Sequence, residues 1–212
     1  MKYKPVIWLF MTSRLKKGMY TCWPSDDIKN LFAKAKPIYK DLLSKMKGIS
    51  DNNPMAGNIT MSFVIISIWL ASERRITPDQ MSEVMRIALD WKPMKVFCGM
   101  IDMNTEKGVR SFGKMMHKNA DWAVKHPEDT NNWDFNFDEN LHKDGFYYHF
   151  TRCPIAEFCK QYGYEEINPV LCNIDFITMS MMHSRLIREH TIAGGADICD
   201  YWTVGNKLAD PK

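Results

Sequence analysis

The chain has 212 residues, of which 45% are hydrophobic and 25% are charged, and these proportions are ordinary for a soluble globular domain. The 28 basic and 25 acidic residues leave a formal charge of +3, which is too small to predict a nucleic-acid partner. The composition excludes collagen-like, coiled-coil and disordered chains. No apolar run reaches the ~20 residues that span a bilayer, so we expect no membrane partner.

The first apolar run, Val6–Met11, follows Lys2 and Lys4. A secretory signal would continue into a small-residue cleavage site, whereas here the basic residues Arg14 and Lys16 follow. We therefore predict a short buried strand or helical turn at this run.

The six cysteines are scattered, without any C-x-x-C pair, which is unlike a disulfide framework or a zinc finger. Without a secretory signal we expect free thiols and a cytoplasmic location. The 16 methionines are interpreted as core packing, because methionine fills irregular apolar gaps.

Apolar periodicity predicts helices in the first half of the chain, over residues 25–46, 61–73 and 77–88, with another after Pro93. The clearest helix start is at Thr77, which is followed by a proline suited to the first helical position and by Gln80. Thr77 and Gln80 have the spacing of a capping box. The polar segment Lys118–Asn132 is predicted to be a connector.

After Trp133 the hydrophobic period changes to two, which is typical of strands. We predict strands at residues 133–137, 146–151, 186–192 and 198–204, with helices at 154–162 and 169–182 between the second and third. Asp144-Gly145 indicates a turn. The order predicts an α+β fold: a helical N-terminal half packed on a small antiparallel sheet of about four strands with two inserted helices. Residues 1–58 are interpreted as a helical extension and 59–212 as an α+β domain, together one compact unit.

Cys153 ends a predicted strand and precedes Pro154, so it lies at the N-cap of the next helix. The helix dipole and free backbone N–H groups favour a thiolate there and would lower the thiol pKa. Arg152 adds positive charge beside it. The alternative is a buried and inert cysteine, which is a common state of free thiols.

Cys172 and Asp175 are three residues apart on the following helix and therefore share a face. Because apolar residues surround Asp175 in the sequence, its carboxylate needs a partner to be stable. It either bridges nearby backbone or carries chemistry, and the pattern leaves both open.

On the last strand, alternation puts Asp200 on the same face as Ile198, Trp202 and Val204, so we expect a carboxylate on the core face with a perturbed pKa. His190, on the neighbouring strand, is within reach of Asp200, but satisfied packing is the commoner fate of a lone histidine. Between these strands, Gly194-Gly195 forms either a plain turn or a backbone site for a substrate anion.

A divalent metal is possible, although no cofactor is expected. The candidate ligands are of the usual types for zinc or manganese, but their spacing is not diagnostic: His149, Cys153, Asp175, His183, His190 and Asp200.

Three ordered blocks of the second half carry a resemblance. They are Phe150–Cys159 with its R-C-P segment, Leu171–Phe176 with C-x-x-D, and His190–Trp202 with T-x-x-x-G-x-x-x-C-D-aromatic. Over roughly residues 60–204 the chain resembles the L-2-amino-thiazoline-4-carboxylic acid hydrolase family, whereas residues 1–55 match nothing recognisable.

The resemblance implies hydrolysis of a carbon–nitrogen bond in a small cyclic amidine, opening 2-amino-thiazoline-4-carboxylate toward a carbamoyl-cysteine. Carried over by motif, it implies five functional residues: Cys153, Cys172, Asp175, Cys199 and Asp200. His190 joins the catalytic candidates, although the motif does not fix a histidine there. From the chemistry of the residues we assign Cys153 as the nucleophile and Asp175 or Asp200 as proton donor or orienter. Gly194 and Gly195 are candidate contacts for the substrate carboxylate, and Thr191 and Arg152 are further substrate-binding candidates.

Two other functions remain open from the residues alone. A non-catalytic domain would hold an apolar small molecule in an aromatic-lined pocket, and a metal-binding protein would use the side chains named above. A metal-activated water is the rival to a thiolate nucleophile. Homo-oligomerisation is possible through the apolar stretch Met61–Ala71.

Overall fold

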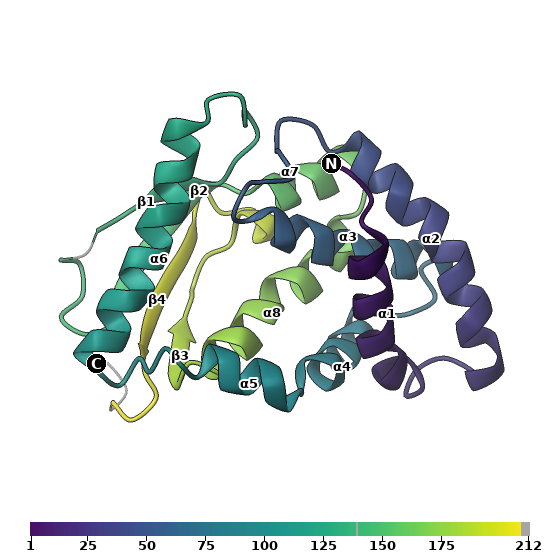
Figure 1. The fold of residues 1–212 in the computed structure, drawn as a ribbon, viewed down its shortest axis with the longest axis horizontal. Coiled ribbons are helices and arrows are strands. Elements are labelled where there is room, and N and C mark those ends of the chain that lie inside the picture. Colours follow the sequence, from purple (N-terminus) through teal and green to yellow (C-terminus); the bar gives the residue numbers. More distant parts are fainter. Residues whose placement is uncertain (139, 209–212) are drawn as a thin grey trace.

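The computed structural model describes residues 1–138 and 140–208 (Figure 1). Six α-helices fill the first half of the chain: α1 Pro5–Met19, α2 Ile28–Lys45, α3 Ala56–Ala71, α4 Pro78–Leu89, α5 Lys92–Cys98 and α6 Glu106–Lys125. The second half contains β1 Asp134–Asn136, β2 Phe146–Arg152, α7 Pro154–Tyr162, α8 Asn168–Ser180, β3 Ser184–Ile187 and β4 Cys199–Gly205. Short 3-10 turns occur at Ser25–Asp27, Glu165–Ile167 and Ile192–Gly194.

The sheet is antiparallel, with strand order β1-β2-β4-β3. The predicted α+β fold, with a helical N-terminal half and about four strands, is thereby confirmed. Helices α7 and α8 are inserted between β2 and β3, as the sequence pattern indicates. Among the described helices, none is both long and apolar enough to cross a membrane.

Helix α3 lies at the centre of the helical half and is buried on nearly all sides. Two of its hydroxyl groups are satisfied within the helix: Thr60 donates to the Ala56 carbonyl at 2.9 Å and Ser67 to the Val64 carbonyl at 2.7 Å. Helix α2 packs on α3, and α1 packs on α4. The ring of Phe63 lies 4.5 Å from that of Phe158 on α7, so one apolar core continues from the first helices into the second half.

The start of α4 agrees with the sequence. The Thr77 side chain accepts a hydrogen bond from the Gln80 backbone N–H at 3.2 Å, and the Gln80 side chain accepts one from the Thr77 N–H at 2.9 Å. These two hydrogen bonds confirm the predicted capping box. The sequence predicts it well because the contacts are local and depend little on tertiary structure.

Two local predictions are wrong. The run Val6–Met11 belongs to the 15-residue helix α1 and is not a short buried element; Val6 is 77% exposed. Residues 118–125 belong to α6, which begins at a Thr105 N-cap and buries Phe112 on its apolar face. In both segments the helix is amphipathic and buries only one face. The apolar or polar character of a short run therefore does not tell whether that run is part of a longer helix.

Helix α6 lies beside the sheet (Figure 1), and its Phe112 ring packs against that of Phe146 on β2, with the ring centroids 5.8 Å apart. The predicted turn at Asp144-Gly145 is present. Gly145 has a φ of +81°, and a Cβ there would lie 2.3 Å from the Thr203 carbonyl oxygen, so this position requires glycine.

The predicted strand 186–192 is shorter and earlier in the structure, because β3 ends at Ile187. The next backbone N–H groups, of Glu189 and His190, bond to the Asp200 side chain at 3.0 and 2.6 Å. The Asp200 side chain thus takes the place of backbone carbonyls of a partner strand, and the β-sheet hydrogen bonding of β3 ends there.

Candidate active site

A cavity of about 400 Å³ lies between the helical half and one face of the sheet. Its walls come from the segment leading into α3, from α5 and α6, from β2 and the start of α7, from α8, and from β4 with the turn that precedes it. Every one of these elements is in the part of the chain that the structure describes. The site is therefore assembled from segments far apart in the sequence.

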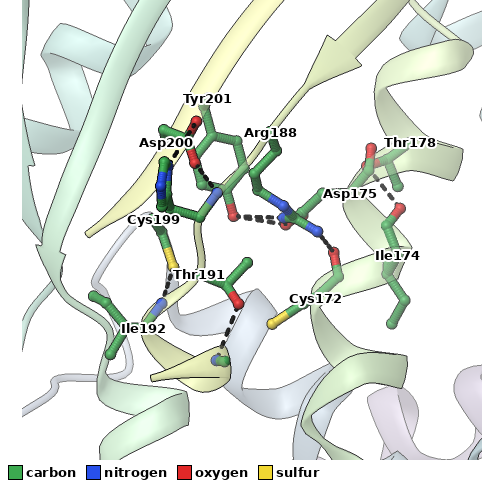
Figure 2. A network of polar contacts seen from close by, with 12 residues as sticks. Cys172, Ile174, Asp175, Thr178, Arg188, Thr191, Ile192, Cys199, Asp200 and Tyr201 are labelled. Carbon is green, nitrogen blue, oxygen red and sulfur yellow. Dashed lines mark hydrogen bonds and ion pairs between the residues drawn. The ribbon is translucent and has the colours of Figure 1, made fainter. Parts of the chain in front are cut away.

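Asp175 and Tyr201 form a polar wall of the cavity, and Arg188 is bonded to both of them without lining the cavity itself (Figure 2). The Tyr201 hydroxyl donates to Asp175 Oδ2 at 2.7 Å, and Arg188 Nη1 donates to the same oxygen at 3.0 Å. Arg188 Nη2 donates to the Cys172 carbonyl at 2.9 Å. Among the described residues, each hydrogen bond to the Asp175 carboxylate ends on Oδ2, so Oδ1 is left to accept from a ligand.

The Asp175 carboxyl is held in a desolvated position, although 33% of its side chain is accessible. Asp175 lines the cavity, and protein surrounds that space. Burial therefore raises the pKa of Asp175, and this outweighs the hydrogen bond from Tyr201 and the charge of Arg188, which lower it.

The partners of Asp175 keep their ordinary protonation states. Burial opposes the charged form of Arg188, but Tyr201 and Asp175 outweigh it and the net direction of its pKa is upward. Burial, followed by the charge of Asp175, raises the pKa of Tyr201 well above its usual value. This cluster therefore holds a neutral phenol and a guanidinium cation beside a carboxyl group whose pKa is raised by burial.

Three cysteines line the same cavity: Cys153, Cys172 and Cys199. Cys153 is the N-cap residue of α7, as predicted, and Cys172 lies one turn from Asp175 on α8. The Cys199 thiol accepts a hydrogen bond from the Ile192 N–H at 3.1 Å. The described cysteines are all free.

The expected depression of the Cys153 pKa is wrong. Burial raises the pKa of this thiol to about 12, although the backbone N–H groups of Ala156 and Ile155 act in the opposite direction. Burial also raises the pKa of Cys172 to about 11. Desolvation of a thiolate in this cavity outweighs the helix N-terminus, so the free protein holds neutral thiols.

The raised pKa of Cys153 predicts slow alkylation of this thiol in the native protein. At pH 7, iodoacetamide should modify Cys153 at least about tenfold more slowly than it modifies the urea-unfolded chain, because little thiolate is present. The rate should rise with pH through the range in which thiolate accumulates. Peptide-resolved mass spectrometry after timed alkylation measures it, and rapid modification below pH 7 would contradict the raised pKa.

Asp200 and His190 approach each other as predicted, but outside the cavity lining. His190 Nδ1 lies 3.8 Å from Asp200 Oδ2, and the Asp200 carboxylate accepts from two backbone N–H groups of the loop before η3 (Ile192–Gly194) (Figure 2). The predicted core face of β4 is also reversed, because Cys199 and Tyr201 are buried while Asp200 is on the less covered face. Asp200 therefore orders the loop.

The four predicted substrate contacts lie outside the cavity lining as well. Thr191 caps η3 by accepting from the Gly194 N–H at 3.0 Å, and Gly195 takes a φ of +96° just after it. Arg152 Nε donates to the Asn132 carbonyl at 2.8 Å. These residues hold the backbone, and from this turn only the neighbouring Ala193 reaches the cavity.

The six candidate metal ligands are not gathered in one place. Within residues 1–138 and 140–208, no group of three or more His, Cys, Asp or Glu side chains is positioned to hold a metal ion. Cys153 and Asp175 line the cavity, whereas the four others do not. His149 is 3.6 Å from Asp138 on another part of the sheet.

Sequence reasoning missed Arg188 and the role of Tyr201. Arg188 follows a short apolar strand directly, and its side chain is only 3% exposed. Two features of the sequence indicate a buried Arg188–Asp175 pair. Arg188 follows an apolar run directly, and Asp175 is embedded among apolar residues, so each charge needs the other as a partner. Tyr201 is the aromatic residue of the third motif block.

The family model of L-2-amino-thiazoline-4-carboxylic acid hydrolase matches residues 57–203, which is more than half of the chain. This protein belongs to that family. The matched range contains the three cavity cysteines, Asp175, Arg188 and Tyr201. No curated protein and no solved structure matches the chain.

Proposed function

We propose that this protein is a hydrolase that opens a C–N bond of a small cyclic amidine, such as 2-amino-thiazoline-4-carboxylate, with Cys153 as nucleophile. The observation that carries the proposal is that Cys153 and Asp175, from two separate motif blocks of a hydrolase family, line one cavity. A thiol and a carboxyl group facing one bound ring are the components of covalent catalysis with proton transfer.

Asp175 binds the amidine. Its Oδ1 accepts from the amidine N–H groups, while Arg188 and Tyr201 hold Oδ2 on the other side. Because the Cys153 thiol is neutral before attack, it loses its proton as its sulfur bonds to the amidine carbon. Asp175 takes this proton, since burial raises its pKa and makes it a stronger base than an ordinary aspartate.

The proton then moves to the ring nitrogen as the C–N bond breaks, which leaves an amine on the opened ring and an imine carbon bound to Cys153. One water adds to that carbon, and the Cys153 sulfur leaves with a proton as a thiol. The sum is one water added and one ring bond broken. Tyr201 stays a phenol throughout and keeps Asp175 oriented.

Product analysis tests this function. The protein is incubated with 2-amino-thiazoline-4-carboxylate and with 2-amino-2-thiazolines substituted at the 4-position, and products are separated by liquid chromatography with mass detection. We expect the mass of one water to be added, with a new primary amine and no new thiol. A free thiol would instead show that the ring C–S bond opens. Absence of any hydrated product with the folded protein would contradict the hydrolase proposal.

The alternative, a non-catalytic small-molecule-binding domain, is favoured by the apolar lining of the cavity. Tyr148, Phe150 and Met179 are part of this lining. Saturable binding of the same amidines without any product would support this second candidate. Elemental analysis of the purified protein, together with chelator sensitivity, tests the metal-binding alternative.

A further inference from the structure

Asn168 and Asp175 lie toward opposite ends of the face that α8 turns to the cavity. Both residues line the cavity, and Cys172 lines it between them. Asp175 follows Asn168 by seven residues, which is nearly two helical turns, so the two share a face and are about 10.5 Å apart along the helix axis. A ligand that lies along this face can contact both side chains at once.

The side-chain amide of Asn168 is buried without a partner. The residue is only 3% exposed, and among the described residues its amide forms no hydrogen bond with any side chain or backbone group. Buried polar groups in native proteins are nearly always hydrogen-bonded, because desolvation without a partner costs free energy. The fold itself makes no use of this amide, so its place on the cavity wall points to a ligand.

The charges at this end of the cavity suit an anion. Asn168 is the first residue of α8, a helix of 13 residues, and the N-terminus of a helix carries partial positive charge. Among the described residues that line the cavity none is a lysine, arginine or histidine, so an anion held there binds to neutral donors. The Nδ2 group of Asn168 is such a donor, and its hydrogen bond to a charged acceptor is stronger than one to a neutral group.

The separation of Asn168 and Asp175 suits a ring that carries both an amidine and a carboxylate. In 2-amino-thiazoline-4-carboxylate, bonds of about 1.3–1.5 Å place the exocyclic nitrogen roughly 5 Å from the carboxylate oxygens. A hydrogen bond of about 2.9 Å at each end extends this span to roughly 11 Å. The span therefore matches the two helical turns between the two side chains.

Cys153 faces the middle of this span. Burial, and after it the neighbouring Cys199 and Cys172, raise the pKa of Cys153, so its thiol is close to the cysteine that lies between Asn168 and Asp175 on α8. A ring held at both ends presents its amidine carbon to this part of the cavity, where the Cys153 sulfur can reach it.

We infer that Asn168 binds the carboxylate of the substrate, with the ring lying along α8 and its amidine at Asp175. The subsite takes a carboxylate on the ring carbon next to the ring nitrogen. This inference rests on the proposed function, and it assigns the carboxylate contact to Asn168 in place of Gly194 and Gly195, which lie outside the cavity lining.

Asn168→Leu tests the inference, because it removes the amide and keeps a similar size. The two substrates compared are 2-amino-thiazoline-4-carboxylate and 2-amino-2-thiazoline, which has the same reacting ring and no carboxylate. We expect the ratio of kcat/KM for the first to kcat/KM for the second to fall at least about tenfold, because a hydrogen bond to a charged group is lost. The urea midpoint should stay unchanged or rise, since the amide has no protein partner to lose.

Two further variants are the matched controls. Asn119 lines the same cavity from α6 and is only partly buried, so Asn119→Leu makes the same chemical change at another wall. Ser62 lines the cavity from α3 and is buried, so Ser62→Ala removes a second buried polar group. We expect both variants to keep the ratio within about threefold of the unaltered protein. A carboxylate-specific loss in either control, with none in Asn168→Leu, would move the subsite and overturn the assignment of Asn168.

The outcomes separate this inference from the proposed function. Hydrolysis of the carboxylate compound with an unchanged ratio in Asn168→Leu would overturn the inference and leave the hydrolase function standing. An equal loss with both compounds and a lower urea midpoint would assign Asn168 a structural role and overturn the inference as well. No hydrolysis of either compound by the folded, unaltered protein would overturn both proposals. The expected fall in the ratio, confined to a folded Asn168→Leu protein, supports both.

Discussion

Replacing Cys153 by serine is expected to reduce cyclic-amidine hydrolysis at least about 10³-fold while the protein remains folded. The substitution removes the sulfur that would bond to the amidine carbon, and a serine hydroxyl is a far weaker nucleophile than a cysteine thiol. Serine also fits the N-cap position of α7, where it accepts backbone hydrogen bonds well. Steady-state kinetics with far-ultraviolet circular dichroism measures both parts of the result.

Two other substitutions are the matched controls for Cys153→Ser. Cys172→Ser and Cys199→Ser change a cysteine of the same cavity, and we expect each to retain activity within about tenfold because neither is assigned a bond to substrate. Near-normal turnover by Cys153→Ser would remove it from the mechanism. Loss of turnover confined to Cys172→Ser would transfer the nucleophile to α8.

Replacing Asp175 by alanine is expected to abolish hydrolysis and to lower the free energy of unfolding by about 3 kcal/mol. The loss of stability follows from Arg188, whose side chain is 3% exposed and which stays charged because a guanidinium does not lose its proton in proteins. Without Asp175 this cation keeps two hydrogen bonds among the described residues, to the Tyr201 hydroxyl and the Cys172 carbonyl, and its contact with the Phe176 ring, but no anionic partner. Urea unfolding and steady-state kinetics provide the measurement.

The double variant Asp175→Ala/Arg188→Met is the control that separates stability from chemistry. It removes the carboxylate and the cation together, so it should regain most of the stability that Asp175→Ala alone loses and regain no activity. Arg188→Met alone leaves a carboxyl group with a further raised pKa. Its stabilising protonated form is present at low pH and lost as pH rises through that pKa, so this variant should be relatively more stable in acid. Equal stability of all four proteins would contradict the buried pair.

The sequence predicts the parts of the site that local pattern determines. Cys153 at a helix N-cap, and Cys172 with Asp175 on one helix face, follow from Pro154 and from helical spacing, and both predictions hold. The capping box at Thr77 holds for the same reason. These features depend on neighbours a few residues apart, so no knowledge of the tertiary fold is needed.

The predictions that are wrong concern properties set by contacts between distant segments of the chain. The pKa of Cys153 is set by how much protein surrounds the thiol, which outweighs the helix end that the sequence reveals. Asp200 was assigned to the wrong face because alternation gives two faces without telling which one the helices cover. Arg188 was missed because its partner is 13 residues away on another element.

Covalent trapping at Cys153 tests the central claim most directly. The protein is mixed with a hydrolysable cyclic amidine, quenched rapidly in acid, and digested for peptide-resolved mass spectrometry. The account predicts a transient adduct of the opened amidine on the peptide that contains Cys153, absent from the Cys153→Ser protein. Turnover without any adduct, or with the adduct on Cys172 or Cys199, would contradict it.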